Sequence, residues 1–211
     1  MKVLVIAPHP DDESIGCGGA ICLHVKRGDR VSAVFLTSGE LGLKHLPAKK
    51  AWQIREKEAA KAAEVLGLTA TTFLRKPDWY LGDHIKDAAA DLKPILTSIA
   101  PDLIYLPHEG EWHPDHKAAA PIVRAALGRK THSVVLRGYE IWTPIAEYDH
   151  YENISSVMSR KIRAVRCHRS QMKEFPYDRA ISGLNQYRGI IAAKAKFAEV
   201  FLTMSPEKRR K

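Results

Sequence analysis

The sequence has few cysteines, no long hydrophobic run and no signal-peptide pattern. Its three cysteines, Cys17, Cys22 and Cys167, form an odd and sparse set, which argues against a disulfide framework and favours a reducing cytoplasm. Apolar stretches such as Val3 to Ala7 fall far short of the roughly 18 residues that a membrane helix requires. The N-terminus lacks the longer apolar region and small-residue cleavage site of an export signal. We therefore expect a cytoplasmic protein without a membrane segment.

The rest of the composition is that of an average globular protein. The 211 residues are 45% hydrophobic and 27% charged, with 13 glycines and 12 prolines, which excludes disordered and fibrous classes. This length suffices for one full hydrophobic core, and no linker or internal repeat divides it. We expect a single domain over residues 1–211, with a core of about 1–142, a helical C-terminal portion of about 150–204 and a basic tail at 205–211.

The net charge of +9 comes from the C-terminal quarter. From Arg160 to Lys211 there are 14 Lys and Arg against 4 acidic residues. Such an excess could contact nucleic acid or an anionic substrate. Because no nucleic-acid motif accompanies it, we favour a solvated helix face followed by a charged tail. The sequence is compatible with a monomer or a homo-oligomer.

Short β-branched or apolar runs alternate with longer helical patterns. The predicted strands are Val3–Ala7, Val31–Thr37, Thr71–Leu74, Leu103–Pro107 and Val134–Gly138. The predicted helices are Gly18–Arg27, Ala51–Leu66, His84–Ile99 and Asp115–Leu127. This alternation predicts an α/β fold with a mainly parallel, Rossmann-like sheet in the order 3-2-1-4-5, covered by helices on both faces. After Trp142, an apolar stripe and the segment Ile190–Met204 predict two more helices; the stripe consists of Ile154, Val157, Met158, Ile162 and Val165.

Polar clusters follow the first and fourth predicted strands, at Pro8–Ser14 and His108–His116. In the predicted order these segments meet at the crevice between strands 1 and 4, where open parallel sheets bind ligands. Consecutive carboxylates repel one another unless a cation or hydrogen bonds offset them. Two imidazoles with one carboxylate suit zinc, iron or cobalt better than magnesium or calcium, and three protein ligands leave positions for water. The clusters therefore predict a catalytic metal site.

The spacing within each cluster constrains which residues bind the metal only in part. Pro114 suits the first turn of a helix, so His113 would lie at its N-terminus with His116 one turn further on the same side. One of these histidines can then bind the metal while the other reaches the substrate. Spacing does not choose between Asp11 and Asp12 as the third ligand.

Other motif interpretations fit less well. The glycines from Gly16 to Gly19 lack the G-x-G-x-x-G spacing of a dinucleotide loop and follow acidic residues that would repel a pyrophosphate. His9-x-Asp11 with a distant histidine matches the facial triad of non-haem iron oxygenases, but that site is expected on an all-β barrel. It is kept as an alternative.

Three residues are candidates for substrate contact. Arg55 lies on the inward, alanine-rich face of the helix Ala51–Leu66, where a guanidinium needs an anionic partner. An equally open interpretation places its head at the surface, paired with Glu58 or Glu40. Glu40 also follows the second predicted strand, at the active edge of the sheet. Trp112, inside the second cluster, could offer an apolar platform to a sugar ring.

These segments resemble the LmbE/PIG-L family of metal-dependent N-deacetylases. The matching blocks span about four-fifths of the chain: Pro8-His9-Pro10-Asp11-Asp12-Glu13, Gly18-Gly19, Thr37-Ser38-Gly39-Glu40, Arg55-Glu56-Lys57-Glu58-Ala59 with Leu66-Gly67, His113-Pro114-Asp115-His116, and Lys161 with His168-Arg169-Ser170-Gln171. The two blocks that begin with His-Pro-Asp are the specific part. The resemblance implies hydrolysis of an N-acetyl group on an N-acetylglucosamine-type sugar or conjugate.

The resemblance also implies roles for individual residues. His9, Asp12 and His116 would bind Zn²⁺, with Fe²⁺ or Co²⁺ as other candidates. Asp11 would be the general base, and His113 would stabilise the oxyanion or protonate the leaving amine.

The remaining roles concern positioning and the substrate. Asp115 would orient a neighbouring histidine and Arg55 would contact the substrate. We also expect the helices after Trp142 to shape the substrate pocket. The local excess of positive charge, rather than the resemblance, motivates the hypothesis that their Arg and Lys residues bind a phosphate or carboxylate on the substrate.

Two other functions stay open at this stage. A metal-dependent amidase or esterase acting on a non-sugar substrate would position the same water with the same motifs. A non-enzymatic nucleic-acid-binding protein would show affinity that falls steeply with salt and ignores chelators. The sequence does not identify the sugar conjugate.

Overall fold

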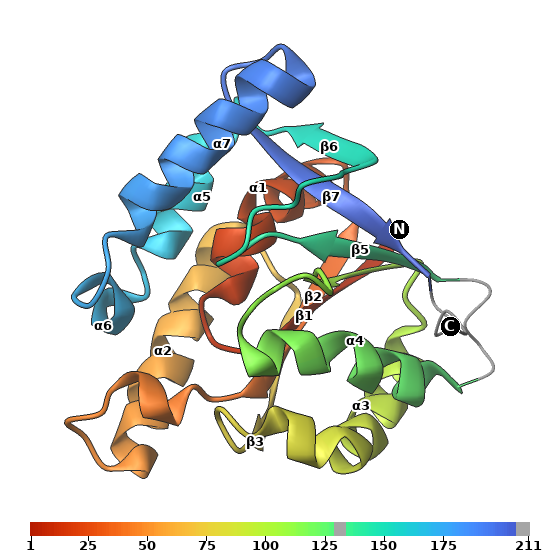
Figure 1. The fold of residues 1–211 in the computed structure, drawn as a ribbon, viewed down its shortest axis with the longest axis vertical. Helices are drawn as coiled ribbons and strands as arrows, with labels where there is room; N and C mark the ends of the chain where they lie inside the picture. The colour runs from red at the N-terminus through yellow and green to blue at the C-terminus, as the bar shows by residue number, and fades with distance from the viewer. Residues whose placement is uncertain (129–133, 206–211) are drawn as a thin grey trace.

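The computed structural model describes residues 1–128 and 134–205, and a seven-stranded sheet runs through this part of the chain (Figure 1). The strands are β1 (Lys2–Ala7), β2 (Arg30–Thr37), β3 (Ala70–Lys76), β4 (Leu103–Pro107), β5 (Val135–Tyr139), β6 (His150–Asn153) and β7 (Ala198–Met204). Their order is β3-β2-β1-β4-β5-β7-β6. Strands β1 to β5 are parallel, as predicted, and β7 is antiparallel to both of its neighbours. The predicted order 3-2-1-4-5 is confirmed.

Helices cover both faces of the sheet because alternate side chains of each central strand are buried on opposite sides. Val3 and Val5 pack against α1 (Asp12–Lys26), α2 (Ala48–Leu66) and α5 (Met158–Val165). Leu4 and Ile6 pack against α3 (Ile85–Ile99) and α4 (Pro114–Leu127), which lie together on the other side in Figure 1. A parallel strand buried on both faces is apolar along its whole length, which is why the strand pattern was readable from the sequence.

The first helix begins earlier than predicted. We expected it at Gly18, but α1 starts at Asp12, so Asp12 and Glu13 lie in its first turn. The helix is interrupted at Cys17, where φ is −141°. The turn from Asp12 is therefore a short helical segment of its own, whose positive N-terminal end favours the carboxylates it carries.

A residue of β7 satisfies the backbone at the break in α1. The carboxylate of Glu199 accepts hydrogen bonds from the backbone N–H groups of Gly19 (2.8 Å) and Ala20 (2.7 Å). Lys161 Nζ lies 2.6 Å from the same carboxylate, and both side chains are buried. The C-terminal part of the chain is thus tied to the helix that begins at the first polar cluster.

The C-terminal portion is not purely helical, and the helix predicted over Ile190–Met204 is wrong. The C-terminal portion contains the one-turn helix α6 (Arg169–Met172) and the helix α7 (Tyr177–Ala193). Helix α7 ends where Lys194 adopts a left-handed conformation (φ 47°), and β7 follows. An apolar run of this length suits a strand or a helix, and pairing with β5 decides for the strand. Of the predicted stripe, Met158, Ile162 and Val165 lie in α5, whereas Ile154 and Val157 precede it. The tail predicted at 205–211 lies, except for Ser205, outside the described residues. None of the described helices is long and apolar enough to cross a membrane.

Candidate metal centre and active site

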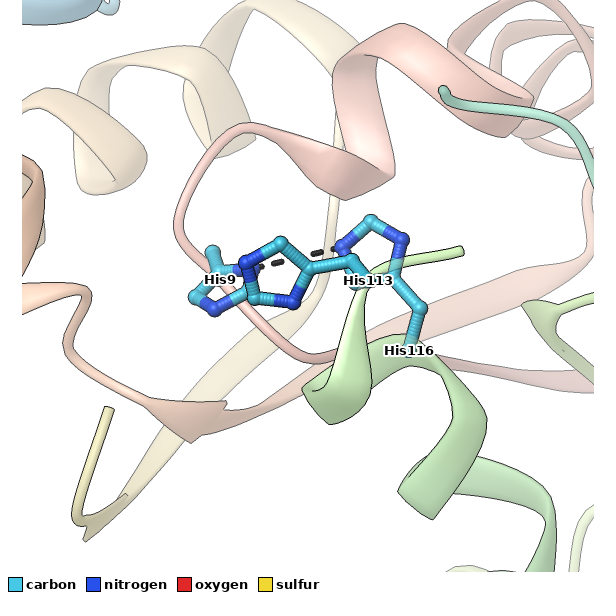
Figure 2. A group of neighbouring side chains, drawn as sticks. All are labelled: His9, His113 and His116. Atoms are coloured by element: carbon cyan, nitrogen blue, oxygen red, sulfur yellow. Dashed lines mark hydrogen bonds between the residues drawn. The ribbon is translucent and has the colours of Figure 1, made fainter. Parts of the chain in front are cut away.

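The two polar clusters converge at the carboxyl ends of β1 and β4. His9 and Asp12 come from the loop after β1 and the start of α1, and His116 comes from the first turn of α4. The three atoms His9 Nδ1, Asp12 Oδ2 and His116 Nε2 lie 3.3 Å from one another in every pair. Figure 2 shows the rings of His9 and His116 turned toward each other, with His113 beside them. All of these side chains are buried.

This spacing suits a metal ion of zinc size. Four tetrahedral ligands at 2.0–2.1 Å from an ion lie about 3.3–3.4 Å from one another, which is the separation observed between the three atoms. The nitrogen atoms of His9, His113 and His116 also lie within 4.8 Å of one another, so a second set with three imidazoles shares two of the same ligands. The donor set present therefore fits a divalent ion without rearrangement.

A carboxylate lies beside the opposite nitrogen of each of these two imidazoles. His9 Nε2 lies 3.0 Å from Asp115 Oδ2 and 3.1 Å from Asp78 Oδ1, so the ring donates its N–H there and keeps the Nδ1 lone pair for the centre. His116 Nδ1 lies 3.4 Å from Glu111 Oε2, long for a hydrogen bond but on the side that fixes the same orientation. Carboxylate partners of this kind orient metal-binding histidines and raise their basicity.

Two of these carboxylates, Asp78 and Glu111, were not assigned a role from the sequence. Glu111 lies inside the second polar cluster, so its position was visible but its partner was not. Asp78 follows β3, and the same rule that picked out the ends of β1 and β4 would have found it. It also accepts from the backbone N–H of Leu41 (2.9 Å).

The charges around the centre favour a cation. Burial lowers the pKa of His9, but hydrogen bonds to Asp115, Asp12 and Asp78 outweigh it and the pKa is raised well above its ordinary value. Burial also opposes the charge on His116, yet Asp12 raises its pKa to about 8. Since ligands must be deprotonated to bind a metal, an ion at this centre would take the place of these protons.

The carboxyl group of Asp12 responds in the opposite sense. Burial raises its pKa, but His116 and His9 outweigh burial and hold it well below the ordinary value. Asp12 is therefore an anion throughout the physiological range, as a metal ligand must be.

Asp11 lies next to the centre in a strained backbone conformation. Its φ is 138°, which a residue with a side chain adopts only when its surroundings hold it there. Its N–H donates to Glu13 Oε2 (3.0 Å), and its Oδ2 lies 3.1 Å from Arg55 Nη2. Burial raises the pKa of Asp11 to about 6, with Arg55 opposing and Asp12 reinforcing the shift. A carboxyl group with this pKa can exchange protons near neutral pH.

The guanidinium of Arg55 points inward and is buried, which decides between the two interpretations of this residue. It donates to the carbonyl oxygens of Gly39 (2.9 Å) and Pro10 (2.8 Å) and pairs with Asp11. The left-handed conformation of Gly39 (φ 62°) leaves room for it, since a Cβ there would lie 2.0 Å from Arg55 Nη1. Arg55 thus joins the Asp11 loop to the loop after β2.

The other two substrate-contact candidates differ in their placement. Glu40 accepts from the backbone N–H of Asp78 (3.0 Å) and thereby ties two loops together, while other residues line the cavity. Trp112 does line the cavity and is 53% exposed at its mouth. Of these two candidates, Trp112 lies in the cavity lining and Glu40 does not.

His113 occupies the N-cap position of α4, as Pro114 predicted. Its Nδ1 accepts from the backbone N–H of Asp115 (3.2 Å), so in the neutral ring the hydrogen is on Nε2. Burial lowers the pKa of His113 to about 4, assisted by repulsion from His9 and His116. His113 is therefore a neutral hydrogen-bond donor that lines the cavity.

Asp115 contacts both histidine systems. Its carboxylate accepts from the backbone N–H groups of Trp79 (2.8 Å) and Leu81 (3.1 Å) besides contacting His9. Its own N–H binds His113. The contact required for the expected orienting role is thus present.

A cavity of about 580 Å³ opens over these groups. It is lined by His9, Asp11, Asp12, Ile15, Leu41, Gly42, Lys44, His45, Arg55, Asp78, Trp79, Trp112, His113, Ile141, Trp142, Gln171, Glu174, Phe175 and Tyr177. Its cationic and imidazole groups all precede residue 142.

The cations expected to bind an anionic substrate from the C-terminal portion lie elsewhere. Arg166 pairs with Asp178, Arg188 with Glu140, and Lys161 with Glu199. The pairs of Lys161 and Arg188 are buried, whereas Arg166 lies at the surface. The residues that the C-terminal portion contributes to the cavity carry no positive charge.

Comparison with known proteins agrees with this geometry. Residues 4–127 match the PIG-L family, described as GlcNAc-PI de-N-acetylase. The chain belongs to the PIG-L family of N-deacetylases. A Bacillus cereus relative, a probable N-acetyl-alpha-D-glucosaminyl L-malate deacetylase 2, is 33% identical over 183 residues, covering 80% of this chain and 83% of its own length.

Solved structures show the same PIG-L fold over nearly the whole chain. The N,N'-diacetylchitobiose deacetylase from Pyrococcus horikoshii superposes with a TM-score of 0.84 at 25% identity, covering 97% of this chain and 84% of that one. The conserved protein TT1542 from Thermus thermophilus gives a TM-score of 0.82 at 29% identity, covering 100% and 97%. The C-terminal portion, which lies beyond the family match, is therefore shared in architecture with these proteins.

Proposed function

We propose that this protein hydrolyses the acetamide of an N-acetylglucosamine-type sugar or conjugate, releasing acetate and a free amine. The observation that carries the proposal is the triangle of His9, Asp12 and His116 atoms at 3.3 Å, open to a cavity that Asp11 and His113 also line. Relatives named as deacetylases of N-acetylglucosaminyl malate and of diacetylchitobiose support this substrate class.

His9, Asp12 and His116 would hold the metal in this function. Two imidazoles and one carboxylate favour Zn²⁺, and Fe²⁺ or Co²⁺ suit the same donors. Bound there, the ion supplies a Lewis acid that lowers the pKa of water and polarises an amide carbonyl. Asp78, Glu111 and Asp115 keep the two imidazoles in the orientation that this requires.

Asp11 is the base in this proposal. It accepts a proton from the attacking water, whose oxygen forms a bond to the amide carbon, and the same proton then passes to the nitrogen as the C–N bond breaks. Arg55 holds one carboxylate oxygen of Asp11 and the Pro10 carbonyl, so it fixes the direction in which Asp11 presents its free oxygen.

His113 supplies the hydrogen bond to the developing oxyanion. Because Asp115 N–H occupies its Nδ1, the Nε2–H is the group it can offer, and a neutral ring with a pKa near 4 keeps this hydrogen throughout. A donor held in place before the reaction stabilises the charge that develops on oxygen. This tautomer favours oxyanion stabilisation over protonation of the leaving amine.

Metal removal and reconstitution test the proposal directly. We expect the purified protein to contain one divalent ion by elemental analysis, to release acetate from N-acetylglucosamine conjugates, to lose this activity with a chelator and to regain it with Zn²⁺. Activity that survives removal of the ion would contradict the metal role. Hydrolysis of esters or non-sugar amides in preference to N-acetylated sugars would contradict the substrate class and favour the amidase or esterase alternative.

The base is tested separately from the metal. Asp11→Asn should lower kcat by roughly 10²–10⁴-fold, the usual contribution of a general base, while the metal content stays at the wild-type level. Asp87→Asn, at an exposed carboxylate of α3, is the matched control and should keep full activity. Loss of the ion in Asp11→Asn would show that Asp11 acts as a ligand instead.

The cytoplasmic location and single-domain organisation stay predictions.

A further inference from the structure

A second cavity of about 200 Å³ adjoins the one over the candidate centre. The two share five lining residues, Ile15, Ile141, Trp142, Phe175 and Tyr177. The second cavity is completed by four residues around the start of α7, Pro176, Ala180, Ile181 and Leu184. We call this second cavity, defined by these nine residues, the apolar chamber.

The walls of the apolar chamber offer almost no hydrogen-bonding side chains. The Tyr177 hydroxyl and the Trp142 indole N–H are the polar side-chain groups among its nine residues. The rings of Trp142, Phe175 and Tyr177 lie 5.7 to 5.9 Å apart in edge-on or tilted contacts. Phe175 is nevertheless 54% exposed and Trp142 38% exposed. When an apolar group covers apolar surface of this kind beside an active-site cavity, the free energy of the complex falls.

A polar extension of the substrate would fit this chamber poorly. Sugar hydroxyls or carboxylates placed there would lose water without gaining partners, which is costly. No lysine, arginine or histidine is among the nine lining residues, and Arg166 and Arg188 of the later segment pair with Asp178 and Glu140. The chamber therefore differs in chemistry from the main cavity, whose lining includes carboxylates, imidazoles and Arg55.

We propose that the apolar chamber binds an aryl or short alkyl substituent of the substrate whose acetamide lies at the candidate metal centre. The inference rests on the proposed function and adds the class of aglycone. The five shared lining residues place the chamber directly beside the main cavity, within reach of a substituent on the substrate. An apolar cavity of about 150 Å³ holds a benzene molecule, so a chamber of about 200 Å³ accommodates a phenyl ring or an alkyl chain of similar volume.

A series of glycosides tests this selectivity on the wild-type holoenzyme. Acetate release is measured from the methyl, butyl and phenyl glycosides of N-acetylglucosamine and from N,N'-diacetylchitobiose, whose extension is polar. We expect kcat/KM to rise by up to roughly fourfold for each added methylene, the phenyl glycoside to exceed the methyl glycoside at least tenfold, and the polar extension to bring no such gain. Equal kcat/KM across the glycosides, or a preference for the disaccharide, would overturn the proposal.

A filled chamber gives the second test. Ala180→Phe places a ring in the space that the substituent would occupy, so the phenyl-to-methyl ratio of kcat/KM should fall toward one. The ratio is taken within one variant and does not depend on how much of it folds. Ala90→Phe, on the exposed side of α3, should keep the wild-type ratio. An unchanged ratio in Ala180→Phe would contradict the chamber, whereas absence of acetate release from every glycoside with the wild-type holoenzyme would contradict the proposed function itself.

Discussion

The parallel part of the sheet and the segment after Trp142 contribute different things to one site. The parallel part supplies the imidazoles and carboxylates of the candidate centre, and the family match over residues 4–127 lies within it. The later segment supplies cavity walls that are largely apolar or aromatic. In the proposed function, the groups that carry the chemistry and the walls that select the substrate therefore lie in separate stretches of the chain.

The later segment also contacts the loop after β1 and the start of α1, which carry His9, Asp11 and Asp12. His168 Nε2 lies 3.2 Å from Glu13 Oε1, and the other oxygen of Glu13 accepts from the backbone of Asp11. Ser170 donates from both its backbone and its hydroxyl to Glu58 on α2. The parallel part thus provides the polar groups of the candidate centre, and the later segment stabilises the loop and helix that carry them.

Among the changes considered, removal of a metal ligand from the parallel part should lower activity the most. His116→Ala leaves two of the three proposed ligand atoms, so the protein should no longer bind the ion. The several kcal/mol of transition-state stabilisation that the ion provides should be lost with it. We expect activity to fall by roughly 10³-fold or more, with metal content measured by elemental analysis. Circular dichroism should show the fold retained. An active, metal-loaded His116→Ala protein would refute the assignment of this ligand.

Breaking the buried ion pair between Lys161 and Glu199, which both belong to the later segment, should disturb the Glu199 carboxylate that binds the backbone of α1. Lys161→Met leaves Glu199 without its 2.6 Å partner, and loss of one partner of a buried pair typically costs about 3–5 kcal/mol. We expect the free energy of unfolding, measured by denaturant titration, to fall by about this amount. Lys57→Met, on the exposed face of α2, provides the comparison and should change stability little. Equal stability of the two variants would mean that this pair does not secure α1.

Glu111→Gln should weaken metal binding without abolishing it. The variant keeps the shape of the side chain but removes the charge 3.4 Å from His116 Nδ1. Partners of this kind contribute roughly 10–100-fold to metal affinity, measured here by competition with a chelator. Fully loaded enzyme should retain most of its kcat. Glu64→Gln on the exposed side of α2 should bind metal like the wild type, and indistinguishable affinities for both variants would remove Glu111 from the site.

The exposed cations of the later segment should matter least. Arg166→Gln breaks a surface pair with Asp178, and such pairs contribute about 0–1 kcal/mol to stability. Because this residue lies away from the cavity lining, kcat/KM for neutral and carboxylated N-acetylglucosamine conjugates should both stay within about twofold of wild type. A selective loss on the carboxylated substrate would restore the original hypothesis of anion recognition by the C-terminal cations.

The sequence predicted most of the parallel part because its patterns are local. Strands buried on both faces are apolar throughout, and their order follows from short right-handed crossovers. Convergence of the two His-Pro-Asp blocks then follows from their places after β1 and β4. The choice between Asp11 and Asp12 could not be made locally, since it depends on the strained φ of Asp11 and on which carboxylate oxygen faces His116.

Where distant contacts decide the outcome, the sequence predicted the wrong structure, left two interpretations open or gave no prediction. The segment Ala198–Met204 becomes a strand because β5 offers it an edge, and its apolar residues alone suit either structure. Arg55 finds its anion in Asp11 rather than in Glu40 or Glu58, because the loop after β1 folds over α2. Asp78 reaches His9 across 69 positions of sequence, a distance that no motif of adjacent residues spans.

Asp115 couples two histidines whose proposed tasks differ. Its carboxylate determines which nitrogen of His9 carries a hydrogen, while its amide determines the same for His113. A substitution at this position changes the carboxylate but keeps the backbone N–H, so it would perturb the tautomer of His9 and ion affinity while the hydrogen bond to His113 remains. Asp78 and Glu111 each contact a single imidazole of the ligand set. Substitutions at these two positions could therefore change metal preference through one ligand at a time.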